Sequence, residues 1–159
     1  MHKAVFFSGV GTIYTTTRMR GEEIEIYPET LPALRFLARR GYSLVLVTNE
    51  RQEYKNFVAQ LKDKSLTVLH YSSGEEELLR FAELRELNLK ESFFVTDGLS
   101  LKSFQTAGCQ QILVLSGKGV QTLSAFQNKH LLEFSDVCKG IYAAAFSIAL
   151  NNNTSIKDM

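Results

Sequence analysis

The sequence lacks long hydrophobic runs and an excess of charge of either sign. No stretch approaches the roughly 20 consecutive apolar residues that a membrane-spanning helix needs. Eighteen basic and seventeen acidic residues leave a formal charge of +1, so the composition carries no electrostatic footprint of nucleic acid or of an anionic membrane. We therefore expect neither a nucleic-acid partner nor a membrane partner.

Cysteine is also scarce. Cys109 and Cys138 lie far apart and form no CxxC pair, which excludes a zinc ribbon and a disulfide framework. Small buried thiols are typical of a reducing compartment. The apolar stretch after Lys3 is too short for the hydrophobic region of a secretory signal. These observations predict a cytoplasmic protein.

What is present is the composition of one folded domain. The 159 residues are 45% apolar and 22% charged, which is ordinary for a globular protein with a substantial core. There is no internal repeat and no low-complexity linker. We expect one α/β domain over residues 1–150 and a polar C-terminal tail over residues 151–159.

Apolar runs alternate with amphipathic segments along the chain, and this alternation predicts a Rossmann-like parallel sheet with helices on both faces and no large cap. Because they are apolar at successive positions, we expect buried strands at residues 4–7, 42–47, 66–69, 93–95 and 111–115. Helical spacing predicts helices over residues 30–40, 51–63, 73–82, 100–107, 121–127 and 139–150.

In such sheets, functional sites lie beyond the carboxyl ends of the strands. Three strand ends carry polar residues or glycines, and they are the candidate site: residues 8–12 (SGVGT), Thr48 with Asn49, and Thr96 with Asp97.

These three ends, in this order, resemble the motifs of the haloacid dehalogenase (HAD) superfamily of phosphatases. The small capless branch, which includes histidinol-phosphate and heptose-bisphosphate phosphatases, is the most similar, and the resemblance covers about residues 3–150. FFSGVGTI has the frame of the family's Asp-x-Asp-Gly-Thr motif, VLVTN matches the second motif with Thr48, and FFVTDGLSL supplies Asp97 at the first acidic position of the fourth.

The departures from the family fall on the residues that carry the chemistry. In the family, the first aspartate attacks phosphorus and the second is the acid and base; the corresponding residues here are Ser8 and Val10. No lysine or arginine lies between Lys64 and Arg80, where the family places its third motif, and the second acidic position of the fourth motif is Leu101. The resemblance therefore implies lost phosphatase activity, with Ser8, Val10, Thr48 and Asp97 at vestigial catalytic positions.

A residual ligand site at these ends is a further expectation. Mg²⁺ needs several oxygen ligands, and Asp97 is the only carboxylate the three ends offer, so we expect no cofactor and a weak metal position at most. Asp97 could instead pair with Lys102 or cap the helix that begins near Ser100, and capping is favoured. Backbone N–H groups and short polar side chains could still hold a phosphate group, through Ser8, Gly9, Val10, Gly11, Thr48 and Asn49.

Two other functional interpretations, serine catalysis and a phosphate-binding P-loop, have less support in the sequence. Ser8 would need a histidine base to act as a nucleophile. His70 follows the strand expected at residues 66–69 and is the only histidine at the carboxyl end of a predicted strand. His2 lies at the start of the first strand, and His130 lies near the start of a C-terminal segment, far from the strand ends in sequence. The Gly117-Lys118-Gly119 stretch lacks the spacing of a phosphate-binding P-loop and is interpreted as a turn.

The sequence thus predicts a HAD-phosphatase-like binding or regulatory module whose partner is a protein or a small anionic ligand, with a homo-oligomer as a further expectation. Two alternatives stay open at this point. One is a weak Mg²⁺-dependent phosphatase acting on a small phosphoester such as a sugar phosphate, in which case Mg²⁺ is the cofactor. The other is a structural or assembly protein.

Overall fold

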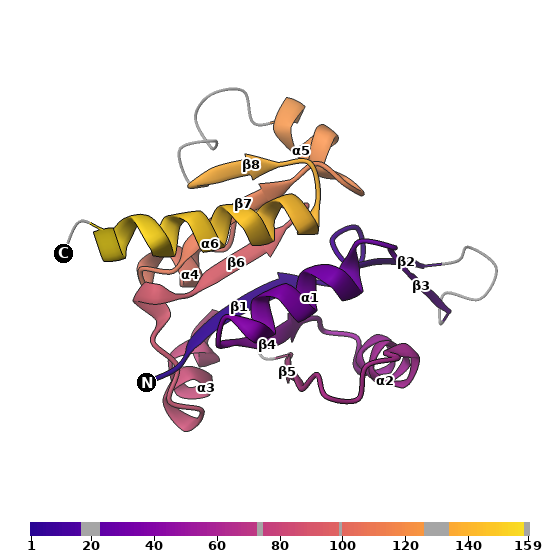
Figure 1. Cartoon of the computed structure of the whole chain (residues 1–159). Helices are drawn as coiled ribbons and strands as arrows, with labels where there is room; N and C mark the ends of the chain where they lie inside the picture. Colours follow the sequence, from indigo (N-terminus) through magenta and orange to yellow (C-terminus); the bar gives the residue numbers. More distant parts are fainter. Residues whose placement is uncertain (17–22, 73–74, 99, 126–133, 158–159) are drawn as a thin grey trace.

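The structure is a computed structural model, and it describes residues 1–16, 23–72, 75–98, 100–125 and 134–157. Its centre is a six-stranded sheet in the order β5-β4-β1-β6-β7-β8, and every neighbouring pair is parallel (Figure 1). The prediction of a Rossmann-like parallel sheet is confirmed. The strands are β1 Lys3–Ser8, β4 Tyr42–Val47, β5 Val68–Tyr71, β6 Phe93–Thr96, β7 Gln110–Val114 and β8 Asp136–Cys138.

The first strand shows why the sequence forms a sheet covered on both faces. Val5 and Phe7 of β1 belong to one hydrophobic core, whereas Ala4 and Phe6 belong to a second core on the opposite face. All four are fully buried, as expected for a central parallel strand.

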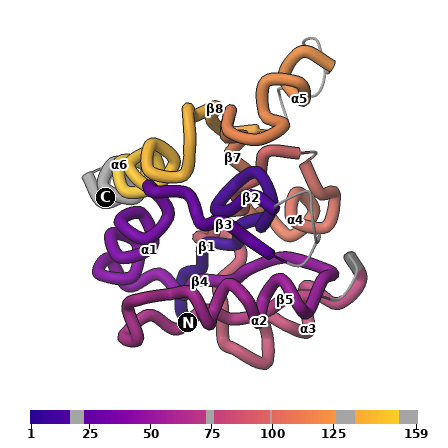
Figure 2. Tube along the Cα trace, turned by 90° about the vertical axis from the view of Figure 1, so that its right-hand side faces the viewer, coloured from indigo at the N-terminus to yellow at the C-terminus, as the bar shows by residue number. Residues whose placement is uncertain are grey.

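Helices cover both faces of the sheet. Figure 2 shows α1 and α6 on one side of it and α3 and α4 on the other. The α1 and α6 residues Leu34 and Ile148 pack in the core of the first face, and the α3 and α4 residues Leu78 and Phe104 pack in the core of the second. The helices are α1 Thr30–Arg39, α2 Arg51–Gln60, α3 Leu78–Leu84, α4 Lys102–Thr106, α5 Gly119–Ala125 and α6 Ile141–Lys157, with short 3-10 helices η1 Glu75–Glu77 and η2 Leu89–Glu91.

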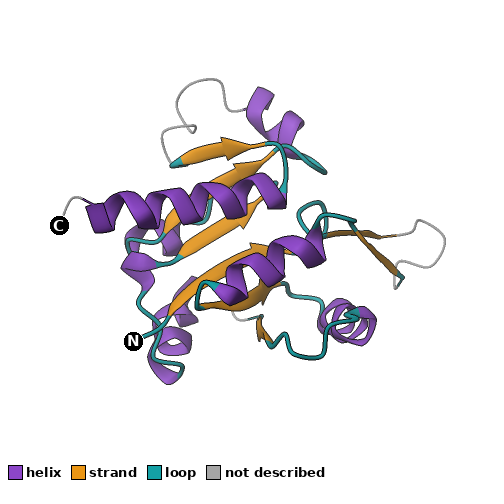
Figure 3. Ribbon diagram, in the orientation of Figure 1, coloured by secondary structure: helices purple, strands orange, loops and turns teal. Residues whose placement is uncertain are grey.

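A small hairpin lies beyond the ends of the strands. The antiparallel strands β2 (Tyr14–Thr16) and β3 (Ile24–Ile26) leave the sheet near the end of β1, on the side toward which the strand arrows point (Figure 3). Between β1 and α1, this hairpin is the only regular structure in the described residues, so no large cap is inserted there.

Several boundaries differ from the sequence prediction: α2 ends at Gln60 rather than residue 63, and α3 begins at Leu78 rather than residue 73. The last helix, expected to end at residue 150, continues to Lys157 because extending a formed helix adds one hydrogen bond for each residue fixed. Strand β5 begins at Val68 rather than Leu66, in register with Leu44 of β4. The edge strand β8 was missed because it is only three residues long and partly polar.

In the part of the chain that the structure describes, there is no helix with the length and apolar character needed to cross a membrane.

Candidate functional site

The strand order brings the three predicted strand ends together. β1 lies between β4 and β6, with Ser8 opposite Val47 and Phe7 opposite Val95. The segments that follow these strands therefore meet at one edge of the sheet, which carries Ser8, Thr48 and Asp97. In the HAD family that the sequence resembles, phosphoryl transfer takes place at this edge.

A short chain of hydrogen bonds starts at the position of the family's nucleophile. The Ser8 and Thr12 hydroxyl oxygens are 2.6 Å apart, and the Thr12 hydroxyl lies 3.5 Å from Asp97 Oδ1, to which it donates. Either hydroxyl can be the donor in the Ser8–Thr12 pair. Thr12 is fully buried and Asp97 is 7% exposed. The Ser8 hydroxyl is thus held by a neighbouring hydroxyl and not by a base.

The second oxygen of Asp97 is bound by the turn after β7. The Lys118 backbone N–H donates to Asp97 Oδ2 at 2.9 Å, and the Thr122 hydroxyl donates to the Asp97 carbonyl oxygen at 2.7 Å. The Gly117-Lys118-Gly119 segment, interpreted from sequence as a plain turn, is therefore the support of this carboxylate.

The predicted capping role of Asp97 is wrong. Leu101, not Asp97, is the N-cap residue of α4, and its backbone N–H donates to Gln111 Oε1 at 2.8 Å. Within the described residues, no ion pair joins Asp97 to Lys102. The turn after β7 provides the partner instead, because β7 is the neighbour of β6 in the sheet.

Two glycines with positive φ enclose the carboxylate. A Cβ atom on Gly11, whose φ is +89°, would lie 1.9 Å from Asp97 Oδ2. A Cβ atom on Gly117, whose φ is +56°, would lie 2.4 Å from the Gly11 Cα atom and 2.6 Å from the same oxygen. Both positions thus need glycine for backbone conformation and for space.

The predicted phosphate-binding groups are partly engaged within the protein. The Gly11 N–H donates to the Tyr14 carbonyl oxygen at 2.7 Å, and Thr48 Oγ1 accepts from the Glu50 N–H at 3.1 Å. Val10, at the family's acid position, is 43% exposed and offers no polar side chain. Binding of phosphate by this loop stays a prediction.

A tyrosine–glutamate pair beside the loop was missed by the sequence analysis. Tyr14 is fully buried, and its hydroxyl donates to Glu53 Oε1 at 2.7 Å. A Cβ atom on Gly9 would lie 2.1 Å from that hydroxyl oxygen, so the phenol packs directly against the glycine loop. Burial, together with the Glu53 carboxylate, raises the pKa of Tyr14 well above its usual value. Nothing in the sequence spacing points to this pair.

His70 is not placed to act as a general base for Ser8. Its Nε2 atom lies 3.1 Å from the Thr48 carbonyl oxygen, and its ring stacks on Tyr54 with centroids 4.6 Å apart. His2 forms a bridge with Leu87 next to the start of β1. His130 lies outside the described residues, as do Ser73 and Gly74 of the third-motif region.

A cleft of about 470 Å³ adjoins the carboxylate. It lies between the glycine loop and the start of α6, and its lining carries the cation of Lys139 and the carboxylate of Glu29. Burial, followed by the negative charge of Asp97, raises the pKa of Tyr27, which also lines the cleft. The field of Asp97 therefore reaches into this space.

The donor set at the strand ends fits Mg²⁺ poorly. Across the described ranges, no group of three or more histidine, cysteine, aspartate or glutamate side chains could hold a metal ion. Asp97 is the carboxylate at these ends, and one of its oxygens already accepts a backbone N–H. A site for Mg²⁺ usually has one or two carboxylates plus substrate phosphate and water.

Solved structures share this architecture. D,D-heptose 1,7-bisphosphate phosphatase from B. bronchiseptica, solved in complex with magnesium and phosphate, superposes with a TM-score of 0.74 over 94% of this chain and 99% of that chain, at 17% identity. The enzyme of the same name from Burkholderia thailandensis gives 0.69 over 92% and 98%, at 20% identity. A putative HAD-like phosphatase from Mesorhizobium loti gives 0.58 over 71% and 72%, at 22% identity.

These observations show a HAD-like fold in a small single-domain form. No protein-family model and no curated protein matches the sequence. At these identities, the likeness to solved structures shows the fold, and the chemistry has to be argued from the residues of the site.

Proposed function

We propose that this chain is a HAD-type protein that has lost phosphatase activity and acts as a binding or regulatory module. The observation that carries the proposal is the hydrogen-bond chain from Ser8 through Thr12 to Asp97. In the family, a free carboxylate attacks phosphorus at the first of these positions. Here the position holds a neutral hydroxyl that is hydrogen-bonded to the buried Thr12 hydroxyl.

The groups that would complete the reaction are absent from the sequence positions that supply them in the family. Val10 cannot carry a proton, and no lysine or arginine lies between Lys64 and Arg80 to neutralise a transferring phosphoryl group. Losing one member of such a catalytic unit commonly lowers the rate by several orders of magnitude. The loss of nucleophile and acid together supports a binding role.

The environment of Asp97 supports the same proposal. Its carboxylate is enclosed by Gly11 and Gly117 and bound by the Lys118 N–H, so the group acts as a structural acceptor. We propose that the protein needs no Mg²⁺ for its function and that millimolar Mg²⁺ does not raise its melting temperature.

The proposed partner is a protein or a small anionic ligand, and the proposed location is the cytoplasm. Both cysteines are free and buried, which suits a reducing compartment.

Hydrolysis of a panel of phosphoesters with and without Mg²⁺ tests the proposal. The panel is offered to the natural protein, to Asp97→Asn and to the double variant Ser8→Asp, Val10→Asp. Glu83→Gln on α3, which removes a negative charge far from the strand ends, is the matched control. We expect no Mg²⁺-dependent turnover by the natural protein above the level of the Asp97→Asn variant.

Mg²⁺-dependent turnover that Asp97→Asn abolishes and Glu83→Gln leaves intact would overturn the proposal. It would identify a weak phosphatase instead. Turnover gained by the double variant alone supports the proposal, because it means that the site retains the family's shape and lacks only its carboxylates.

A further inference from the structure

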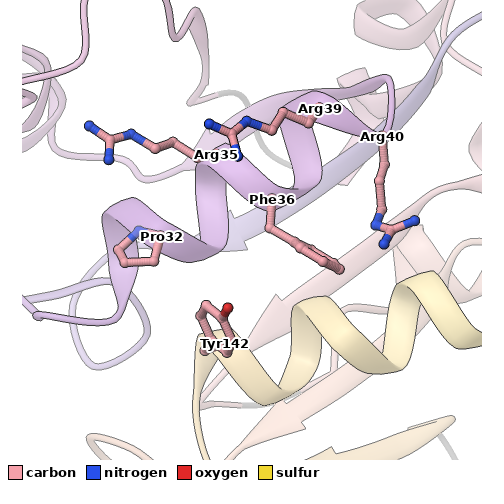
Figure 4. Close-up of a pocket in the computed structure, with 6 residues that line it drawn as sticks. All are labelled: Pro32, Arg35, Phe36, Arg39, Arg40 and Tyr142. Atoms are coloured by element: carbon pink, nitrogen blue, oxygen red, sulfur yellow. The ribbon is translucent and has the colours of Figure 1, made fainter.

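A groove of about 500 Å³ lies between α1 and α6 on the first face of the sheet, and it does not include any of the predicted site residues. Figure 4 shows Phe36 and Arg40 reaching from α1 toward α6, with Tyr142 of α6 facing Phe36. Arg35 and Arg39 extend along the outer side of α1 in the same view. The groove is lined by Pro32, Arg35, Phe36, Arg39, Arg40 and Tyr142.

The groove offers exposed aromatic surface. The Phe36 ring centroid lies 6.5 Å from that of Tyr142 and 4.9 Å from that of Phe146, and the last two are 5.1 Å apart. Tyr142 is 36% exposed and Phe146 is 45% exposed. Aromatic rings that are only half covered can stack with a planar ring of a ligand.

The groove also offers cations without carboxylate partners. Arg35 is paired with Asp63 at 2.8 Å, whereas Arg39 and Arg40 have no ion pair with any of the described residues. The Arg40 guanidinium stacks on the Phe36 ring, 4.4 Å from its centroid. Guanidinium groups match phosphate geometry with two parallel hydrogen bonds.

Helix electrostatics alone do not account for this arrangement. A cation in the last turn of a helix is favoured by the helix dipole, which accounts for Arg39. The dipole gives no reason for three aromatic rings to gather beside the cations with two of them partly exposed.

We propose that the groove between α1 and α6 binds a nucleoside 5′-phosphate. The planar base stacks on the exposed Tyr142 ring, and the phosphate is held by Arg40, the unpaired arginine that reaches toward α6. The volume falls in the range of about 300–1,000 Å³ that is typical of small-molecule sites.

A single-stranded nucleic acid fits less well. Such ligands need a basic track that follows several backbone phosphates, whereas the cations here come from one helix of a chain with a formal charge of +1. Inorganic phosphate would use the arginines and leave the rings uncovered. The proposal therefore requires the base and the phosphate together.

The experiment is calorimetric titration of the full chain with four nucleoside 5′-monophosphates, with ribose 5-phosphate and adenosine as partial ligands. We expect at least one monophosphate to bind with submillimolar affinity at low salt. Ribose 5-phosphate lacks the base and adenosine lacks the phosphate, so each should bind at least about tenfold more weakly, the equivalent of one stacking or charge-assisted contact.

Single-residue variants test whether the ligand binds in the groove between α1 and α6. Arg40→Gln and Tyr142→Leu change exposed positions and leave the core intact, and each should weaken binding at least about fivefold. Arg80→Gln on α3 removes the same charge elsewhere and should leave the affinity unchanged. Lys139→Gln, in the cleft beside Asp97, should also leave it unchanged.

No binding of any monophosphate at millimolar concentration would overturn the proposal. So would equal binding of ribose 5-phosphate, or a loss in Arg80→Gln equal to that in Arg40→Gln, since either would indicate attraction of charge alone. A loss in Lys139→Gln with none in Arg40→Gln would place the ligand at the strand ends and would equally refute the groove. The proposed loss of phosphatase activity is independent of all these outcomes.

Discussion

Replacement of Gly11 by alanine tests the enclosure of Asp97 more directly than any other change. The new methyl carbon would lie 1.9 Å from Asp97 Oδ2, far inside van der Waals contact, and it would sit on a backbone with φ of +89°. Either the carboxylate or the loop has to move. If the carboxylate moves, it gives up the hydrogen bond from the Lys118 N–H.

The magnitude follows from these two contributions. A left-handed backbone conformation costs about 1–2 kcal/mol for a residue with a Cβ atom. Loss of a hydrogen bond to a charged group adds about 1.5–3 kcal/mol. Gly11→Ala should therefore lower the free energy of unfolding by about 2.5–5 kcal/mol, which for a chain of this length lowers the melting temperature by about 10 °C.

Gly41 provides the matched control. Its φ is +87°, nearly the same as that of Gly11, but nothing lies within 4 Å of the position of an added Cβ atom. Gly41→Ala should cost only the backbone part, about 1–2 kcal/mol. Urea denaturation of both variants, and of Gly11→Ala in an Asp97→Ala background, measures the difference. Equal losses for Gly11→Ala and Gly41→Ala, or a loss at Gly11 that Asp97→Ala does not relieve, would refute the reasoning.

Two other changes probe contacts described here. Tyr14→Phe removes the donor to Glu53 and leaves the ring in place, so denaturant titration should show a loss of about 1–2 kcal/mol, and an unchanged midpoint would contradict the structural role of this pair. The Ser147 hydroxyl, followed by the Val137 N–H, lowers the pKa of Asp136. This carboxylate therefore contributes stability above its unfolded-state pKa and loses that contribution as the pH falls through the folded value. Between pH 6 and pH 3, the melting temperature of Asp136→Asn should fall less steeply than that of the natural protein, and parallel curves would exclude the contribution.

The sheet could be predicted from the sequence because its signal is local. The run around Phe6 and Phe7 is apolar at successive positions, which only a strand covered on both faces explains well. The strand order could then be anticipated only through the resemblance to the family. Short edge strands such as β8 contain too few apolar residues to be predicted from the sequence pattern.

The contacts of the site could not be predicted in the same way. Asp97 and Lys118 are 21 positions apart, and Tyr14 and Glu53 are 39 positions apart. Neither spacing belongs to a helix or a turn, so only the arrangement of strands in space brings these groups together. The sequence correctly placed Ser8 and Asp97 at one edge of the sheet, and it assigned the Asp97 carboxylate to the wrong neighbour.

The central place of β1 has a consequence for biosynthesis. This strand is made first, yet one of its two edges is covered only by β6, and the Ala4 N–H bonds the Ser92 hydroxyl 88 positions along the chain. On the ribosome, the backbone N–H and C=O groups on one edge of β1 therefore stay unpaired until the second half of the chain has emerged. A message that stops between β5 and β6 would release a fragment whose first strand is paired on one side only, and such a fragment should aggregate or be captured by chaperones rather than persist as a half-sheet.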